Sequence, residues 1–550
     1  MALRHVNAVI VGAGAGGGVV AKELATAGLS VVLLERGRWY DAAADRKDDL
    51  QNQRTTVLGN GFGPDDDRNP RVLVDKQGER LVFPSEGDYS NNAACVGGGT
   101  FSYGAQAWRF MEKDFRMRST YGAVPGSTLE DWPIAYQDLE PFYEKAEWEL
   151  GVSGDDSNNI FKAPRHKPLP MPPLPPTREH QILLPAAGRL GLHPFDIPML
   201  RNSVPYNGRR SCMRCRWCCG FACEVDARSG THNTVIPAAL ETGNCELRTE
   251  CMTRDIMLDD GGHAKGVAYF DTSNRLREQT ADLVIVSCGA VESARLLLNT
   301  RHRLFPTGLG NRFDWVGRNL QAHTYPAGVG LFEEETYDDI GPGASIAICD
   351  YNHGNAGLAG GGMLANEFIR LPYQFQNFVP PWVPRWGQAY KDYVRHAFKR
   401  TVVVMGPVQE IPVFDARVQA DPTTNDYWGI PVARMSGTRH PHTIEIANYM
   451  RGKAEAWLRE AGAVRTFGWG GSPGLSGGQH QAGTCRMGND PKTSVVNKDC
   501  QLHDVDNVYV IDASVHVTNG GFNPALTILA NAYRASNNLL QTWKGSKVRG

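Results

Sequence analysis

Five of the twelve cysteines in this chain fall within thirteen residues, 211–223. Their spacing, C-x2-C-x2-C-C-x3-C, gathers several thiolates around one small centre, as iron–sulfur clusters and zinc sites require. The two adjacent cysteines could instead bond to another in a disulfide, or all five could stay plain thiols. The spacing alone leaves these alternatives open for Cys212, Cys215, Cys218, Cys219 and Cys223.

A second group of residues, near the N-terminus, is typical of a dinucleotide-binding site. Gly12, Gly14 and Gly17 have the spacing G-x-G-x-x-G, and Glu35 follows them. The glycines allow the backbone to approach a pyrophosphate at a helix N-terminus, and the carboxylate accepts hydrogen bonds from a ribose. A glycine-rich turn in an ordinary α/β sheet is the alternative, but the complete motif favours dinucleotide binding.

Hydrophobic periodicity indicates the elements that position these residues. Residues 6–11 and 30–35 predict short buried strands, and residues 19–28 predict a helix between them. This βαβ unit places the three glycines in its first turn. Residues 281–300 predict another strand, turn and helix, and residues 501–512 predict a strand before a glycine-rich turn.

Length and charge limit the class of protein. A chain of 550 residues is too long for one compact core, so two or more domains are expected. The net charge of −2 gives no electrostatic reason to expect nucleic acid or anionic membranes as partners. No apolar run approaches the roughly 20 residues of a membrane helix, and the N-terminal residues lack a signal-peptide pattern. We therefore expect a cytoplasmic protein without direct membrane insertion.

Motifs at both ends of the chain resemble those of the glucose–methanol–choline (GMC) family of flavin oxidoreductases. Residues 21–37 and 131–154 are similar to its dehydrogenase branch, which includes gluconate, fructose and glucose dehydrogenase large subunits and glucoside 3-dehydrogenases. Besides the βαβ unit, the resemblance rests on CVGGGTFSYGAQAWRF at 95–110, HQAGTCRMGNDP at 480–491, NVYVIDAS at 507–514 and GGFNPALTILANAY at 520–533.

The resemblance implies the fold and the cofactor. It implies an α/β protein, in which a Rossmann-like FAD-binding domain is joined to a substrate domain built on an antiparallel sheet packed by helices. The FAD-binding domain is expected over 1–150, 205–325 and 475–550, and the substrate-binding domain over 151–204 and 326–474. The cofactor implied is FAD rather than NAD.

The family motifs also imply a catalytic base at His480 and a polar partner at Asn523. Oxidation of an alcohol removes a hydroxyl proton, which a neutral imidazole can accept, and a hydride, which goes to flavin N5. A second polar side chain fixes the alcohol oxygen. We expect His440 and His442 to be structural, and His516 is the next candidate for the base.

Further cofactor contacts follow the same motifs. Some relatives tether FAD covalently through a histidine a few residues after the glycine-rich turn near residue 98. Residues 95–110 contain no histidine, and Ser102 stands near the expected place, so non-covalent FAD is predicted. The remaining contacts are expected at Gly98, Gly99, Thr100, Asp512, Ala513 and Pro524.

The predicted reaction is FAD-dependent oxidation of an alcohol to a carbonyl, with a secondary hydroxyl of a sugar, glycoside or polyol as substrate. Three alternatives remain: an oxidase that reduces oxygen to hydrogen peroxide, a lyase that keeps FAD without redox turnover, and an electron relay without a substrate. Residues 341–400, rich in glycine and aromatic residues, either cover a sugar-sized ligand or pack as an ordinary excursion.

The resemblance extends to the cysteine run. Sugar dehydrogenases of the same branch carry a three-iron cluster in the corresponding region, which implies an iron–sulfur cluster here. Such enzymes pass electrons to a haem subunit, so a small subunit and a cytochrome or other electron acceptor are the implied partners. Export with a signal-bearing partner would make the protein periplasmic.

Overall fold

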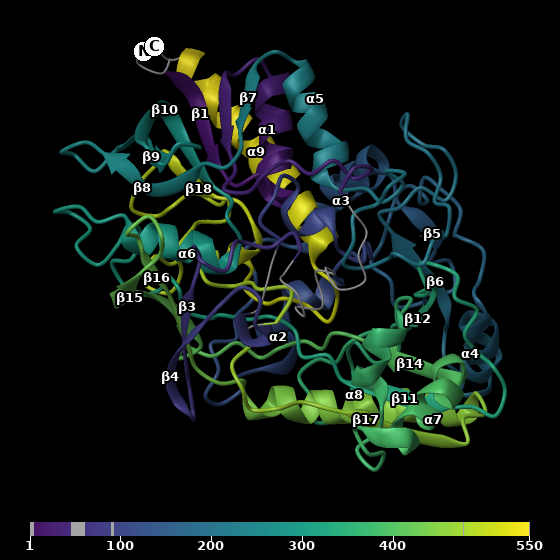
Figure 1. Ribbon diagram of the computed structural model, residues 1–550. Coiled ribbons are helices and arrows are strands. Elements are labelled where there is room, and N and C mark those ends of the chain that lie inside the picture. Colours follow the sequence, from purple (N-terminus) through teal and green to yellow (C-terminus); the bar gives the residue numbers. More distant parts are fainter. Residues whose placement is uncertain (1–4, 46–60, 90–92, 477, 549–550) are drawn as a thin grey trace.

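The computed structural model describes residues 5–45, 61–89, 93–476 and 478–548. Two large sheets, each covered by helices, form the upper and lower parts of the molecule in Figure 1. The N-terminal residues 1–4, which bear on the prediction about a signal peptide, lie outside the described part. The α-helices are α1 (Ala15–Thr26), α2 (Met117–Tyr121), α3 (Tyr136–Leu150), α4 (Arg178–Arg189), α5 (Val235–Glu241), α6 (Ala290–Asn299), α7 (Gly387–Ala397), α8 (Pro441–Glu460) and α9 (Ala525–Val548).

The first sheet confirms the predicted Rossmann-like unit. Its strands follow the order β7-β2-β1-β10-β9-β8, and β18 pairs in parallel with the C-terminal end of β10, residues 284–286. The βαβ unit is parallel, whereas β8, β9 and the start of β10 form an antiparallel meander. The strands are β1 (Val6–Val11), β2 (Val31–Leu34), β7 (Cys245–Arg248), β8 (Met252–Leu258), β9 (Ala264–Phe270), β10 (Leu276–Val286) and β18 (Val508–Val510).

Helix α1 begins at Ala15, four residues before the predicted start. The sequence there is rich in glycine, which has a low helix propensity. Tertiary packing accounts for the difference, because a Cβ on Gly16 would lie 2.0 Å from the Ile511 carbonyl oxygen and a Cβ on Gly18 would lie 2.8 Å from Thr231. Only glycine allows the first turn of α1 to approach these neighbours.

The second sheet is antiparallel throughout and confirms the predicted substrate-domain architecture. Its order is β17-β11-β14-β13-β12-β6-β5. Helix α8 packs on β11, β14 and β17, and α4 packs on α8. The strands are β5 (Ser153–Asp155), β6 (Phe195–Met199), β11 (Ala327–Leu331), β12 (Ile346–Ile348), β13 (Leu364–Asn366), β14 (Thr401–Met405) and β17 (Arg465–Trp469).

A smaller four-stranded sheet joins distant parts of the chain. Strands β15 (Arg417–Asn425) and β16 (Pro431–Ser436) pair with β3 (Arg71–Asp75) and β4 (Gly78–Val82) in the order β15-β16-β3-β4. This sheet therefore combines residues from both of the predicted domains. The domain boundaries themselves stay a prediction.

Helices α1 and α5 pack on the first sheet, α9 packs on α1, and α3 packs on α9; buried apolar residues of these helices belong to the larger hydrophobic core. A second core lies between α8, α4 and the second sheet. In the part of the chain that the structure describes, no helix is both long and apolar enough to cross a membrane. The 3-10 helices are η2 (Gly87–Tyr89), η3 (Gly98–Phe101), η4 (Glu112–Phe115), η5 (Thr231–Asn233), η6 (Pro372–Phe378), η7 (Phe398–Arg400) and η8 (Ala513–Val515).

Candidate active site

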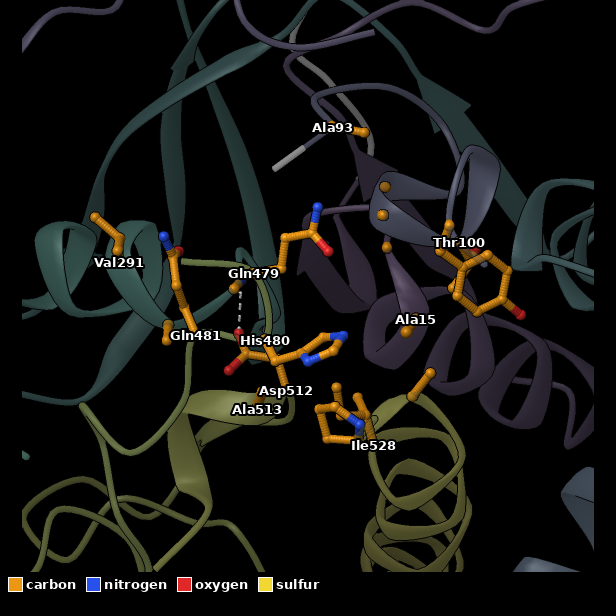
Figure 2. Close-up of a pocket in the computed structure, with 18 of the residues that line it drawn as sticks. Ala15, Ala93, Thr100, Val291, Gln479, His480, Gln481, Asp512, Ala513 and Ile528 are labelled. Atoms are coloured by element: carbon orange, nitrogen blue, oxygen red, sulfur yellow. Dashed lines mark hydrogen bonds between the residues drawn. The ribbon is translucent and has the colours of Figure 1, made fainter. Parts of the chain in front are cut away.

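A cavity of about 580 Å³ lies where the first sheet faces the second. Val11, Leu34 and Ser287, at or just beyond the carboxyl ends of β1, β2 and β10, line one side, and Met405 of β14 lines the other. The carboxyl edge of a parallel sheet is the usual ligand position in such folds. Figure 2 shows the His480 side chain pointing from its loop into this space.

The glycines of the N-terminal motif have two different roles. Gly12 has a φ of +102°, and a Cβ there would lie 2.3 Å from the Ser287 carbonyl oxygen. Gly14 lines the cavity, and a Cβ on it would meet no protein atom within 4 Å, so a ligand can approach its backbone. Gly17 does not line the cavity; a Cβ there would lie 1.9 Å from the Gly12 carbonyl oxygen, so this glycine serves packing.

The turn at residues 98–100 faces the same loop. Gly98 has a φ of +50°, and a Cβ on it would lie 3.0 Å from the Gly14 Cα, so the two backbones approach closely. Gly99 and Thr100 also line the cavity. The Thr100 hydroxyl accepts a hydrogen bond from the Thr231 backbone N–H at 3.1 Å, which ties the turn to η5.

Glu35 follows β2 directly and is almost fully buried beside the glycine loop. Its two carboxylate oxygens accept hydrogen bonds from the backbone N–H groups of Ala13 and Gly37, both at 2.9 Å. Burial raises the pKa of Glu35, and the two backbone donors oppose that shift. The carboxylate thus lies where the dinucleotide motif requires an acceptor for a ribose hydroxyl.

Asp512, Ala513 and Pro524 line the cavity from the C-terminal part of the chain. One Asp512 oxygen accepts hydrogen bonds from the Gly289 N–H at 2.9 Å and the Ser293 hydroxyl at 2.6 Å. The carboxylate therefore holds the N-terminus of α6 against the 512–513 turn. This contact fixes the shape of the cavity wall.

His480 lies in the loop between β17 and the C-terminal motif, with a φ of +69°, which is uncommon outside glycine. Its carbonyl oxygen accepts a hydrogen bond from Asn519 Nδ2 at 2.8 Å, which holds this conformation. Its ring Nδ1 lies 3.0 Å from Nδ1 of His323 and 3.2 Å from the hydroxyl oxygen of Tyr325. Backbone strain of this kind is often found at functional sites.

The Tyr325 hydroxyl connects Asn523 to His480. The Asn523 Nδ2 donates a hydrogen bond to the Tyr325 hydroxyl oxygen at 3.0 Å, and all three side chains line the cavity. The Asn523 Oδ1 is buried and has no hydrogen-bond partner among the residues that the structure describes. Because a hydroxyl group both donates and accepts, the amide can turn and present either its oxygen or its nitrogen to a ligand.

The electrostatics of the site favour an uncharged imidazole. Burial, together with the nearby His323, holds the pKa of His480 well below its ordinary value. Burial also lowers the pKa of His323, although the negative charge of Glu410 opposes that shift. A neutral histidine facing a cavity can accept a proton from a bound hydroxyl.

The other candidate histidines lie elsewhere. His516 is fully buried outside the cavity, with Nδ1 3.1 Å from Asn519 Oδ1. His440 caps the N-terminus of α8 by accepting from the His442 N–H at 3.1 Å, and His442 Nε2 accepts from the Ala359 N–H at 2.9 Å. Both of these contacts are structural.

The cysteine run lies beside the cavity, and none of the twelve cysteines, all of which are described, forms a disulfide. Arg201 lies among the sulfurs, with Nη1 3.1 Å from Cys218 Sγ and 3.7 Å from Cys212 Sγ. A hydrogen bond from Cys215 and the charge of Arg201 hold the pKa of Cys218 well below its ordinary value, against the effect of burial. Cys219 lines the cavity itself.

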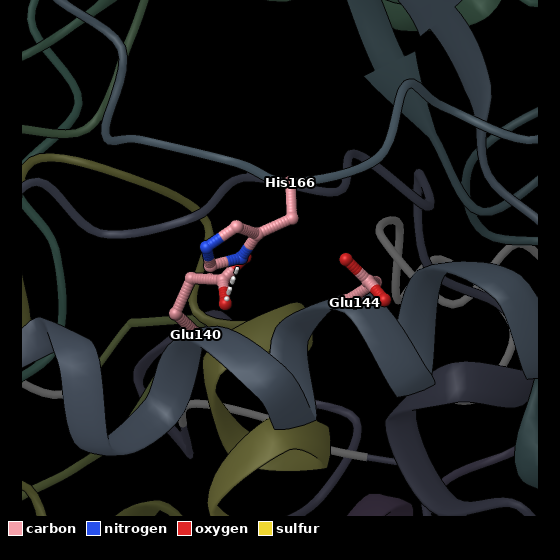
Figure 3. A group of neighbouring side chains, drawn as sticks. All are labelled: Glu140, Glu144 and His166. Carbon is pink, nitrogen blue, oxygen red and sulfur yellow. Dashed lines mark hydrogen bonds and ion pairs between the residues drawn. The ribbon is translucent and has the colours of Figure 1, made fainter.

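The cysteine sulfurs are too dispersed for a preformed zinc site. Ligands around one zinc lie roughly 4 Å apart, given Zn–S bonds of about 2.3 Å. Within the described residues, the only three metal-ligating side chains with ligand atoms within 4.8 Å of one another are Glu140, Glu144 and His166 (Figure 3). Glu140 pairs with Arg109 and His166, and Glu144 pairs with Lys167, so this group is an ion-pair network.

Sequence reasoning did not single out His323 and Tyr325. Both lie in the segment QAHTYP at 321–326, between the last strand of the first sheet's meander and β11. The only hint in the sequence was that a histidine and a tyrosine, both able to exchange protons, stand two residues apart. Their contact with His480, more than 150 residues away in the chain, comes only from the fold.

Family models decide the identity. The N-terminal GMC oxidoreductase model matches residues 125–325, and the C-terminal GMC oxidoreductase model matches residues 415–532, together more than half of the chain. The chain belongs to the GMC oxidoreductase family. It is therefore an FAD-dependent oxidoreductase that acts on CH–OH groups, as its motifs predicted.

Curated relatives cover nearly all of this GMC oxidoreductase. The gluconate 2-dehydrogenase flavoprotein of Pantoea cypripedii is 28% identical over 96% of the chain and 93% of the relative. Paromamine 6'-oxidase of Streptomyces fradiae is 29% identical over 96% and 90%, respectively. The fructose dehydrogenase large subunit of Gluconobacter japonicus is 25% identical over 98% of both chains.

Solved structures agree on the fold. Pyridoxine 4-oxidase from Mesorbium loti superposes with a TM-score of 0.62 at 16% identity, covering 97% of this chain and 98% of the other. The cavity of this GMC oxidoreductase also fits FAD. Gly14 and Gly99 leave room beside their backbones, and the Glu35 carboxylate lies next to the start of α1.

Proposed function

We propose that this GMC oxidoreductase oxidises a secondary hydroxyl of a sugar, glycoside or polyol, with His480 as the base and Asn523 as its partner. One observation carries the proposal: the Tyr325 hydroxyl oxygen lies 3.2 Å from His480 Nδ1 and 3.0 Å from Asn523 Nδ2. All three residues line the same cavity as Gly14 and Gly99. An electron relay without a substrate would need no such arrangement.

The residues of the chain handle the proton. Burial and the nearby His323 lower the pKa of His480, which favours a neutral ring that can accept the hydroxyl proton of a bound alcohol. The Asn523 amide can hydrogen-bond the alcohol oxygen and so direct the carbinol C–H bond. Bound FAD supplies the acceptor for the hydride of that carbon. A lyase that keeps FAD without redox turnover would not use this combination of a base, a polar partner and a hydride acceptor.

The lining of the cavity supports a polar, ring-sized substrate. Gln479 and Tyr325 add polar groups near His480, whereas Phe368 and Met405 add apolar surface. Mixed lining of this kind suits a sugar, which has polar edges and apolar faces. The gluconate and fructose dehydrogenase relatives act on substrates of this class, as their names state.

We propose that FAD is held without a covalent bond. Ser102 stands near the place where some family members have a tethering histidine, and it lines the cavity. Acid denaturation followed by filtration should release all of the yellow colour, and colour that stays with the protein would contradict the proposal.

We further propose that electrons leave through a protein acceptor rather than oxygen. Two of the three relatives described above are dehydrogenases, and one is named a large subunit, which supports a small subunit and a cytochrome as partners. The oxidase relative keeps direct reduction of oxygen as the alternative. The location is then cytoplasmic, or periplasmic if a partner carries the export signal.

An iron–sulfur cluster at the cysteine run stays a prediction that the relatives do not support by name. The buried Arg201 beside Cys212 and Cys218 favours thiolates, which are the ligands of such clusters. Plain thiols are the remaining alternative, since no disulfide forms. Cys219 links the run to the cavity.

The proposed reaction can be tested by anaerobic bleaching of the flavin with a panel of sugars, glycosides and polyols. At least one secondary alcohol should bleach the flavin fully, and matched compounds without that hydroxyl should not. If no member of the panel bleaches a fully loaded holoenzyme, the proposed substrate class is wrong. Hydrogen peroxide formed on admission of air would identify an oxidase.

A further inference from the structure

His323 is a buried histidine that faces the base directly. It is 4% exposed, it lines the cavity, and its ring is edge-on to that of His480, with ring centres 5.2 Å apart. Neither the family motifs nor the predicted reaction assign it a role. Its hydrogen bonds determine which nitrogen of each ring carries a proton.

The Nε2 atom of His323 must carry hydrogen. It lies 2.9 Å from the Gly520 carbonyl oxygen and 3.2 Å from the Asn519 carbonyl oxygen. Carbonyl oxygens only accept hydrogen bonds, so the nitrogen between them is the donor. A neutral imidazole has one N–H, and burial lowers the pKa of His323 and so favours the neutral ring, in which Nδ1 holds a lone pair.

The lone pair on His323 Nδ1 determines the tautomer of His480. The two Nδ1 atoms lie 3.0 Å apart, a hydrogen-bond distance, so one of them must donate. Since His323 Nδ1 is the acceptor, His480 Nδ1 carries the proton. Neutral His480 then has its lone pair on Nε2. The opposite tautomer of His480 would place two lone pairs against each other.

We infer that His323 is a positioning residue, which holds His480 in the Nδ1–H form so that its Nε2 is ready to accept the proton of the alcohol. When the substrate O–H bond breaks and the Nε2–H bond forms, His480 becomes an imidazolium. Its Nδ1–H bond to His323 then becomes charge-assisted and stronger, which stabilises the product of proton transfer. The inference rests on the proposed function.

Glu410 fixes His323 in place. Its carboxylate accepts hydrogen bonds from the Thr324 hydroxyl at 2.9 Å and the Ala322 N–H at 3.3 Å, the residues on either side of His323. Arg439 Nε lies 3.3 Å from the same carboxylate. Apart from His480, the titratable groups near His323 include Glu410, Tyr325, Asp114 and His516, and Arg439 pairs with Glu410.

Two substitutions at one position separate the acceptor from the rest of the ring. His323→Asn leaves an amide oxygen near the Nδ1 position, whereas His323→Gln moves its amide towards Nε2 and removes the acceptor. With an alcohol that bleaches the flavin, we expect His323→Gln to lower the limiting rate of flavin reduction roughly tenfold or more, and His323→Asn to stay within about threefold of wild type. Equal rates in both variants and wild type would overturn the inference.

The tautomer itself can be measured without substrate. In holoenzyme with ¹⁵N-labelled histidine rings, the His480 signals are those lost in His480→Gln, and His442→Gln is the matched control. We expect Nδ1 of His480 to be protonated and Nε2 to be bare in wild type and His323→Asn, with a mixture in His323→Gln. A protonated Nε2 in wild type would overturn the inference.

The two measurements separate the two proposals. If no alcohol bleaches the flavin, the proposed function fails, yet the tautomer of His480 still confirms or contradicts the role of His323. If bleaching requires His480 but is unaffected in His323→Gln, only the role of His323 is wrong.

Discussion

The Nδ1 atoms of His323 and His480 lie 3.0 Å apart in the wall of the cavity. The first belongs to the segment before β11 and the second to the loop after β17. Since β11 and β17 are neighbours in the second sheet, the pairing of these strands brings the two histidines together. The second sheet therefore contributes to the positioning of the base as well as to the lining of the cavity.

Tyr325 should matter for the arrangement of the site. Tyr325→Phe removes the hydroxyl that Asn523 Nδ2 bonds at 3.0 Å and leaves a partly buried amide donor without this partner. Loss of such a partner typically costs about 1–3 kcal/mol. We expect a lower unfolding temperature and roughly tenfold slower flavin reduction, measured by thermal melts and stopped-flow absorbance. Wild-type values in both would show that the hydroxyl does not organise Asn523.

Glu35 should govern retention of the cofactor. Glu35→Ala removes the carboxylate beside the glycine loop, which we expect to bind the ribose and not the reacting groups, so FAD should be lost more readily while the loaded fraction still reacts. The measurement is the flavin-to-protein ratio after gel filtration. Glu79→Gln, on the exposed strand β4, is the control. Equal flavin content in Glu35→Ala and wild type would contradict the assignment.

Stability should fall in acid because of buried neutral histidines. Burial lowers the pKa of His516 to about 4 and that of His232 to about 3, from 6.5. As the pH drops below about 6.5, these histidines become protonated in the unfolded chain but stay neutral in the folded chain. The free energy of unfolding therefore decreases until the pH reaches their pKa in the folded protein. His516 alone accounts for roughly 3 kcal/mol between pH 7 and pH 4.

This pH dependence can be measured by urea unfolding at several pH values. His516→Leu should be less sensitive to acid than wild type, whatever its stability at neutral pH. His396→Gln, exposed on α7, should keep the wild-type slope. An unchanged slope in His516→Leu would show that another group dominates.

The cysteine run makes a compositional prediction. If it holds an iron–sulfur cluster, anaerobically purified protein should contain about three to four irons per chain. Cys223→Ser should lose the iron but leave the flavin reducible by substrate, while transfer to a cytochrome fails. Cys245→Ser, in β7, is the control. Protein without iron, prepared anaerobically from iron-replete cells, would leave plain thiols as the only interpretation.

Local motifs allowed much of the site to be predicted. Gly12, Gly14 and Glu35 have roles that follow from a short βαβ unit, and His480 and Asn523 stand in motifs that resemble those of the family. Each of these residues lines the cavity, and their catalytic and cofactor-binding roles stay predictions. Their placement depends on a chain segment of fewer than about 30 residues, where periodicity and spacing are informative.

Contacts between distant segments could not be predicted in the same way. His323 and Tyr325 acquire their role only when β11 pairs with β17. Among the aromatic residues of 341–400 weighed as a cover for the ligand, Phe368 lines the cavity, whereas Phe375 is buried in a separate apolar cluster and Trp386 is 82% exposed. Composition could not separate these outcomes, because burial depends on the tertiary fold.

The most direct test of the account is anaerobic stopped-flow reduction of the flavin in His480→Gln, using an alcohol that bleaches the wild-type holoenzyme. We expect full retention of FAD and a rate of reduction about 100-fold or more below wild type, because the proton acceptor is lost. His442→Gln should react at the wild-type rate. If His480→Gln reduces its flavin within about threefold of wild type, His480 is not the base, and the proposed mechanism is wrong.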